Sequence, residues 1–82
     1  MQAIQKLKDL KRQKASAIAE EIISAMVRNN VTFYKKSTCD YHAGAPTEEH
    51  RLMPLVCEIL QEQGIAHSHA INFGVSDWTF TV

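Results

Sequence analysis

Six side chains in this sequence are of the types that bind zinc: Cys39, His42, His50, Cys57, His67 and His69. Cys39 and His42 are separated by two residues, and His67 and His69 by one. Residues two apart on a β-strand point to the same face, so the second pair could direct both imidazoles one way. Together the four could form a tetrahedral zinc site. Strong zinc sites typically show pairs of CxxC or HxxxH motifs, and the sequence contains neither. We therefore predict no metal and no cofactor, and a small zinc-binding protein stays an alternative.

Cys39 is also a candidate nucleophile. Asp40 and His42 follow it closely, and a cysteine–histidine pair can activate a thiolate. Nucleophile and base usually come from separate elements, however, and no glycine-rich phosphate loop is present in the sequence. A chain of 82 residues also has little room for a deep cleft. We therefore expect a protein that is not an enzyme.

Basic residues are concentrated in the first half of the chain. Residues 1–36 carry eight Lys and Arg against three acidic residues, and residues 37–82 carry one against six, giving +5 and −5. Such a distribution suggests a charged partner or head-to-tail self-association, although the halves could also neutralise each other within the fold. The candidate partner-binding residues are Lys6, Lys8, Lys11, Arg12, Lys14, Tyr34, Lys35 and Lys36.

The basic segment could contact phosphate groups. An aromatic residue among lysines, here Tyr34, is the kind of side chain on which single-stranded nucleic acids stack. No helix-turn-helix, zinc-finger or RNA-recognition signature is present in the sequence. Nucleic-acid binding through the basic N-terminal helix is therefore an alternative to protein binding.

The first element is a long helix over Met1–Asn29. Apolar residues recur on one side of its helical wheel, interrupted at Lys11, and strong helix formers dominate its composition. Its first half, Met1–Lys14, is basic on nearly every face. We expect that half to project from the body of the protein or to lie against something acidic.

A second helix is expected to begin at a capping Thr47 and to end at Gly64, where a left-handed residue stops it. Pro54 lies inside its apolar pattern. The helix either kinks at Pro54 or begins there, and the unbroken apolar face from Leu52 to Leu60 favours the kink.

Residues that alternate between apolar and polar predict three strands, at Val31–Lys36, Ile65–Phe73 and Trp78–Val82. Ser37–Pro46 is expected to be a loop and Gly74–Asp77 a turn, because both are rich in turn-forming residues. The final strand has few charges, which makes it a candidate sheet edge.

The order α-β-α-β-β predicts one α+β domain over residues 1–82, with residues 1–14 as a projecting basic extension. We expect a small two-layer sandwich with both helices on one face of a short three-stranded sheet. The residues expected in its core are Ile18, Ile22, Leu55, Val56, Ile59, Leu60, Ile71, Trp78 and Phe80.

No secretory signal or membrane-spanning stretch is recognisable, so we expect a cytoplasmic protein with reduced cysteines. The absence of a catalytic motif favours a non-enzymatic protein-binding module. We expect a stoichiometric inhibitor or regulator of the kind found in phages and mobile elements, with another protein, acidic or associated with nucleic acid, as its partner. Ile4, Leu7 and Leu10 are apolar residues in a part of the helix that extends beyond what two helices over a small sheet can cover. Uncovered apolar residues often mark a contact surface, which favours a homodimer.

Overall fold

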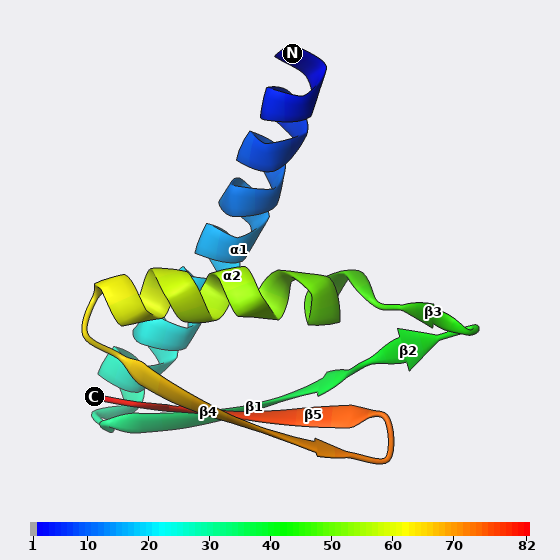
Figure 1. Cartoon of the computed structure of the whole chain (residues 1–82). Coiled ribbons are helices and arrows are strands. Elements are labelled where there is room, and N and C mark those ends of the chain that lie inside the picture. Colours follow the sequence, from blue (N-terminus) through cyan, green and yellow to red (C-terminus); the bar gives the residue numbers. More distant parts are fainter. Residues whose placement is uncertain (1) are drawn as a thin grey trace.

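The structure of the protein, a computed structural model, describes residues 2–82 and confirms the predicted α+β class. Both helices lie on one side of a three-stranded antiparallel sheet, and a small two-stranded hairpin lies beside it (Figure 1). Met1, the first residue of the predicted N-terminal helix, lies outside the described residues. The elements in chain order are α1 (Gln2–Asn29), β1 (Phe33–Cys39), β2 (Tyr41–His42), β3 (Ala45–Pro46), α2 (Glu48–Glu62), β4 (Ala66–Asn72) and β5 (Val75–Thr81).

Helix α1 is buried only in its second half. Ala15, Ala19, Ile22 and Met26 recur at helical spacing and are buried, and the two alanines let α2 cross α1 closely because their side chains are small. Residues 2–14 are exposed on every side, and this half of the helix projects from the body of the protein (Figure 1). The helix ends at Asn29, and the next residue, Asn30, has a left-handed φ of 52°, which asparagine tolerates.

Helix α2 begins and ends as its sequence predicts. The Thr47 hydroxyl accepts a hydrogen bond from the amide of His50 at 3.2 Å, which caps the first turn. Gly64 has a φ of +85°, and the amide of Ile65 donates to the carbonyl of Leu60 at 3.0 Å, the pattern of a Schellman cap. Pro54 lies inside the helix, so the alternative in which the helix starts there is wrong.

The sheet has the order β1-β5-β4, with both strand pairs antiparallel. The predicted edge position of the last strand is wrong, because β5 lies in the centre. The predicted turn at Gly74–Asp77 is also too long. Phe73 and Gly74 alone make the turn, and Ser76 is buried on the same face as Trp78 and Phe80. The start of β5 was not predicted because its inward-facing residue there, Ser76, is polar and does not continue the apolar alternation.

The expected loop Ser37–Pro46 is largely ordered as strands. Strand β1 starts two residues later than predicted and continues to Cys39, and Tyr41–His42 pairs with Ala45–Pro46 in a short hairpin. Its turn is formed by Ala43 and Gly44, both with positive φ. The hairpin leads the chain from the end of β1 to the cap of α2.

The core lies between the two helices and the inner face of β5. Phe80, Leu60 and Val56 are fully buried, as predicted, whereas Leu55 and Ile18 only pack partly against the core. The predicted burial of Ile71 is wrong, because 70% of that side chain is exposed. Every residue of β4 is exposed, and this strand lies at the edge of the sheet with β5 as its one neighbouring strand.

Candidate protein-binding site

The projecting half of α1 and the first turns of α2 enclose a groove of about 280 Å³. Its α1 wall carries apolar and basic side chains, and its α2 wall carries an acidic, a basic and an apolar one. The residues that line it are Leu7, Leu10, Lys11, Lys14, Glu48, Arg51 and Leu52. The groove therefore combines apolar with charged side chains.

An apolar stripe on α1 includes Leu7 and Leu10, which line this groove, and continues to Ile4 outside it. Ile4, Leu7 and Leu10 are spaced three residues apart and so share one helix face. Their side chains are 51%, 66% and 46% exposed, which agrees with the expectation that the body of the protein leaves them uncovered. Lys6 and Lys8 lie about 100° to either side of Leu7 on the helix. The stripe is therefore bordered by two lysines.

Three basic residues of the first half pair with acidic residues of the second. Lys14 Nζ lies 2.9 Å from a carboxylate oxygen of Glu48, Arg12 lies 3.5 Å from Glu62, and Lys36 lies 2.7 Å from Glu49. Exposed pairs of this kind contribute up to about 1 kcal/mol each. The opposite charges of the two halves thus neutralise each other in part.

The remaining lysines of the stripe have no such partner. Within residues 2–82, no acidic side chain lies within ion-pair distance of Lys6, Lys8 or Lys11. All three are exposed. This end of α1 therefore presents an uncompensated positive charge beside uncovered apolar side chains.

The other candidate residues lie apart from the groove. Tyr34 packs against the core and lines a hollow with Arg28 and Glu20, at the second half of α1. Lys36 faces α2, as its pair with Glu49 shows, and Lys35 points to the opposite face of β1 because neighbours on a strand alternate. The structure therefore does not join these three residues to the α1 lysines.

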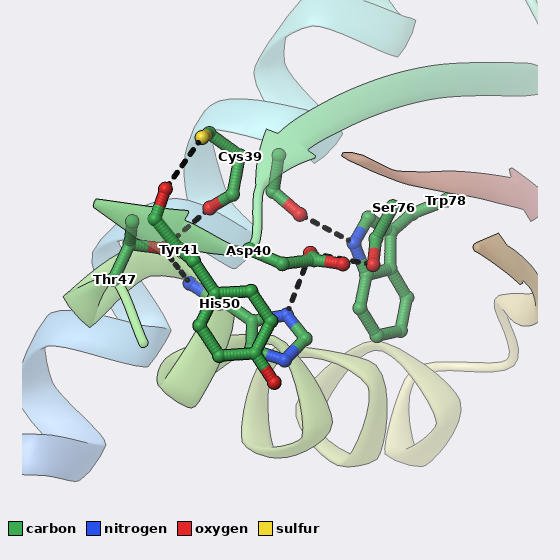
Figure 2. A network of polar contacts seen from close by, with 8 residues as sticks. Cys39, Asp40, Tyr41, Thr47, His50, Ser76 and Trp78 are labelled. Carbon is green, nitrogen blue, oxygen red and sulfur yellow. Dashed lines mark hydrogen bonds and ion pairs between the residues drawn. The ribbon is translucent and has the colours of Figure 1, made fainter. Parts of the chain in front are cut away.

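The α2 wall of the groove is held in place by a network centred on Asp40, which is 3% exposed (Figure 2). Its Oδ1 accepts a hydrogen bond from Ser76 Oγ at 2.6 Å and lies 3.0 Å from Nδ1 of His50. The second contact is not aligned as a hydrogen bond, and becomes an ion pair when the imidazole is protonated. Asp40 thus links the end of β1 to β5 and to the first turn of α2.

Backbone contacts strengthen the same junction. The amide of Asp40 donates to the carbonyl of Gly74, and the amide of Thr47 donates to the carbonyl of Asp40. Thr47 Oγ1 donates to the carbonyl of Cys39 at 2.5 Å. A buried carboxylate near the start of a helix is also favoured by the helix dipole. These contacts fix the direction in which α2 leaves the sheet.

The network does not have the arrangement of a nucleophile triad. In such a triad the imidazole lies between the hydroxyl and the carboxylate, whereas here the carboxylate of Asp40 lies between Ser76 and His50 (Figure 2). Ser76 is also fully buried, which removes its hydroxyl from any substrate. Its geometry is that of a structural clamp.

The structure does not bring the four metal candidates Cys39, His42, His67 and His69 together. Cys39 pairs with Val75 on the outer face, and His69 pairs with Trp78 on the inner face. Cys39 and His69 are separated by two strand spacings across the sheet and by three residues along the strands. Their Cα atoms therefore lie roughly 14 Å apart. His42 lies in the β2–β3 hairpin, and His69 stacks on the Trp78 ring at 3.8 Å. Within residues 2–82 no three metal-binding side chains come together.

The two cysteines are expected to differ in reactivity. Cys39 is exposed and Cys57 is buried in the core, where burial raises the pKa of the Cys57 thiol to about 11. The thiolate is the reactive form, and at pH 8 only about one Cys57 in a thousand would carry it. Titration with Ellman's reagent at pH 8 should therefore report one thiol in the folded protein and two in urea. Two rapidly reacting thiols without denaturant would contradict the packing of Cys57.

From the sequence, the basic residues are named as binding candidates, whereas the Asp40 clamp is not anticipated. Its members come from the junction between β1 and β2, from α2 and from β5, and only the fold brings them together. The one local signal was an acidic residue shortly before a capping threonine. Among residues 2–82 no helix is long and apolar enough to cross a membrane. Comparisons with protein-family models, with curated proteins and with solved structures found no match, and the function must be inferred from the surface itself.

Proposed function

We propose that the protein is a non-enzymatic binding module whose α1 groove takes up an acidic amphipathic helix of another protein. It would act by binding that helix and covering its apolar face, as a stoichiometric inhibitor or regulator does. The observation that carries the proposal is the stripe of Ile4, Leu7 and Leu10, bordered by lysines that have no ion-pair partner within residues 2–82. Such a surface is complementary to a helix with apolar anchors and acidic flanks.

The dimensions of the surface suit a helical partner. Residues 4–14 of α1 span roughly 15 Å, about three helical turns, which matches anchors at i, i+3 or i+4 and i+7 on the incoming helix. Complete burial of an aliphatic side chain contributes about 1.5–3 kcal/mol. Because Ile4, Leu7 and Leu10 are each about half exposed, covering each of them on binding would contribute about half of that free energy. The apolar stripe would provide affinity, while the lysines would provide orientation and a fast association rate.

The apolar stripe also favours protein over nucleic acid. A phosphate backbone would pair with Lys6, Lys8 and Lys11, but it offers no apolar surface to cover Leu7 and Leu10. An amphipathic acidic helix satisfies both the apolar and the basic part of the surface.

Charge reversal tests this proposal. The probe is a fluorescein-labelled helical peptide of about 18 residues, with leucines at i, i+3, i+4 and i+7 and mainly glutamate elsewhere. The K8E/K11E variant should bind it at least tenfold more weakly than wild type in 50 mM NaCl, because two attractive charges become repulsive. The difference should shrink as NaCl rises, since salt screens exposed charges.

The matched control is R28E/K35E, which makes the same change in net charge away from the groove and should bind as wild type does. Circular dichroism establishes that both variants fold. Equal binding by the two variants would overturn the proposal, as would a peptide that binds no better than its leucine-to-glutamine counterpart. Tighter binding of a random-sequence oligonucleotide than of the peptide would favour the nucleic-acid alternative.

A further inference from the structure

The β4 strand is an unprotected sheet edge. All seven of its residues are exposed, and Ala66–Asn72 contains no Asp, Glu, Lys, Arg or Pro. The other edge, β1, carries Lys35 and Lys36, and lysines on an edge oppose pairing with another strand. Only the β1 edge therefore carries charged residues that oppose pairing with another strand.

The turn after β4 shows which backbone groups of the strand are free. Phe73 and Gly74 form a two-residue turn with left-handed φ angles of 52° and 78°. The residues that flank such a turn, Asn72 and Val75, form a hydrogen-bonded pair. Backbone groups alternate in direction along an antiparallel strand, so those of His67, His69 and Ile71 point away from β5. The free edge therefore offers donors and acceptors in the antiparallel spacing.

We propose that two copies of the chain pair through their β4 edges, in antiparallel register about a two-fold axis at His69, to form one six-stranded sheet. This register overlaps all seven residues, because Ala66 then lies opposite Asn72 of the second copy. It brings no Asp, Glu, Lys or Arg side chains together. It sets His69 opposite His69 of the second copy on the inner face, and small side chains, such as Ser68 and Ala70, against each other on the outer face. The contact is isologous, as closed dimers require.

The same register joins a protruding side chain to a hollow. Phe73 is 100% exposed at the tip of the β4–β5 turn, and the axis at His69 sets it opposite Ile65 of the second copy. Ile65 lines a hollow at the start of β4, together with Gln61, Gly64, Ala66 and His67. By symmetry the fit occurs twice. A strand edge alone is a narrow contact, and each phenyl ring adds roughly 150–250 Å² when buried towards the roughly 800 Å² per subunit of a stable dimer.

Sedimentation equilibrium at 10–300 µM tests this dimer. The wild type should approach twice the 9.3 kDa chain mass as its concentration rises. Phe73→Asn should raise the dimer dissociation constant at least tenfold, because it removes the ring while asparagine suits the left-handed turn position. Ile71→Lys should have a similar effect, since it places a lysine on the edge as in β1. The control Phe33→Asn removes an exposed ring from β1 and should leave the dimer intact.

The alternatives give different results. A wild type that stays monomeric at 300 µM would overturn the proposal. A dimer that tolerates both β4 substitutions but dissociates in L7D/L10D would overturn it in favour of contact through α1. Open-ended oligomers would indicate head-to-tail pairing and overturn the two-fold arrangement. None of these results depends on the binding of an acidic helix, which is measured separately.

Discussion

Replacing Phe80 by alanine should lower the free energy of unfolding by about 3–5 kcal/mol. Phe80 is fully buried at the centre of the sheet's inner face, where its ring packs within the core formed by both helices. A domain of this size has a total stability of only about 4–12 kcal/mol, so the variant should be partly unfolded at 37 °C. Urea denaturation followed by circular dichroism measures the change.

The matched control is Phe33→Ala. Phe33 is half exposed on the outer face of β1, and its truncation should cost about 1 kcal/mol or less because little buried surface is lost. If both substitutions shifted the denaturation midpoint equally, the core would not lie on the inner face of β5.

Replacing Asp40 by alanine should lower the free energy of unfolding by about 1–3 kcal/mol, the usual cost of leaving a buried polar group without its hydrogen-bond partner. The substitution leaves the hydroxyl of Ser76 buried without its acceptor and frees the first turn of α2 from the sheet. Because α2 forms one wall of the groove, the acidic peptide should also bind more weakly to the folded fraction. Thermal unfolding and peptide titration measure the two effects.

Asp77→Ala is the control for Asp40→Ala. Asp77 accepts a hydrogen bond from Ser37 at 2.6 Å, but both residues are exposed, so water replaces the lost partner. The expected change in stability is within about 0.5 kcal/mol. A similarly small effect at Asp40 would show that the clamp does not hold α2 in place.

The elements that could be predicted from sequence are those with local signals. The period of apolar residues located both helices, and capping residues located the ends of α2 at Thr47 and Gly64. The alternation in Ile65–Phe73 located β4. The exposure of Ile4, Leu7 and Leu10 followed from counting apolar residues against the surface that could cover them.

The features that escaped prediction depend on the order of strands and on contacts between distant residues. Ile71 has the alternation of a buried residue, yet it is exposed because β4 lies at the edge. No local pattern distinguishes an edge strand from a central one when both are short and apolar. The pairing of Asp40 with Ser76 spans 36 residues, and neither residue type signals burial by itself.

The most direct test of the proposed binding site is to locate the bound peptide by NMR. Titration of the acidic amphipathic peptide into ¹⁵N-labelled protein should shift amide resonances in residues 4–14 of α1 and 48–52 of α2, while those of β1 and β5 stay in place. This pattern is expected because the stripe of Ile4, Leu7 and Leu10 and the groove beside it are the contact surface. Shifts confined to the sheet, or no shifts at a fivefold excess of peptide, would contradict the proposal.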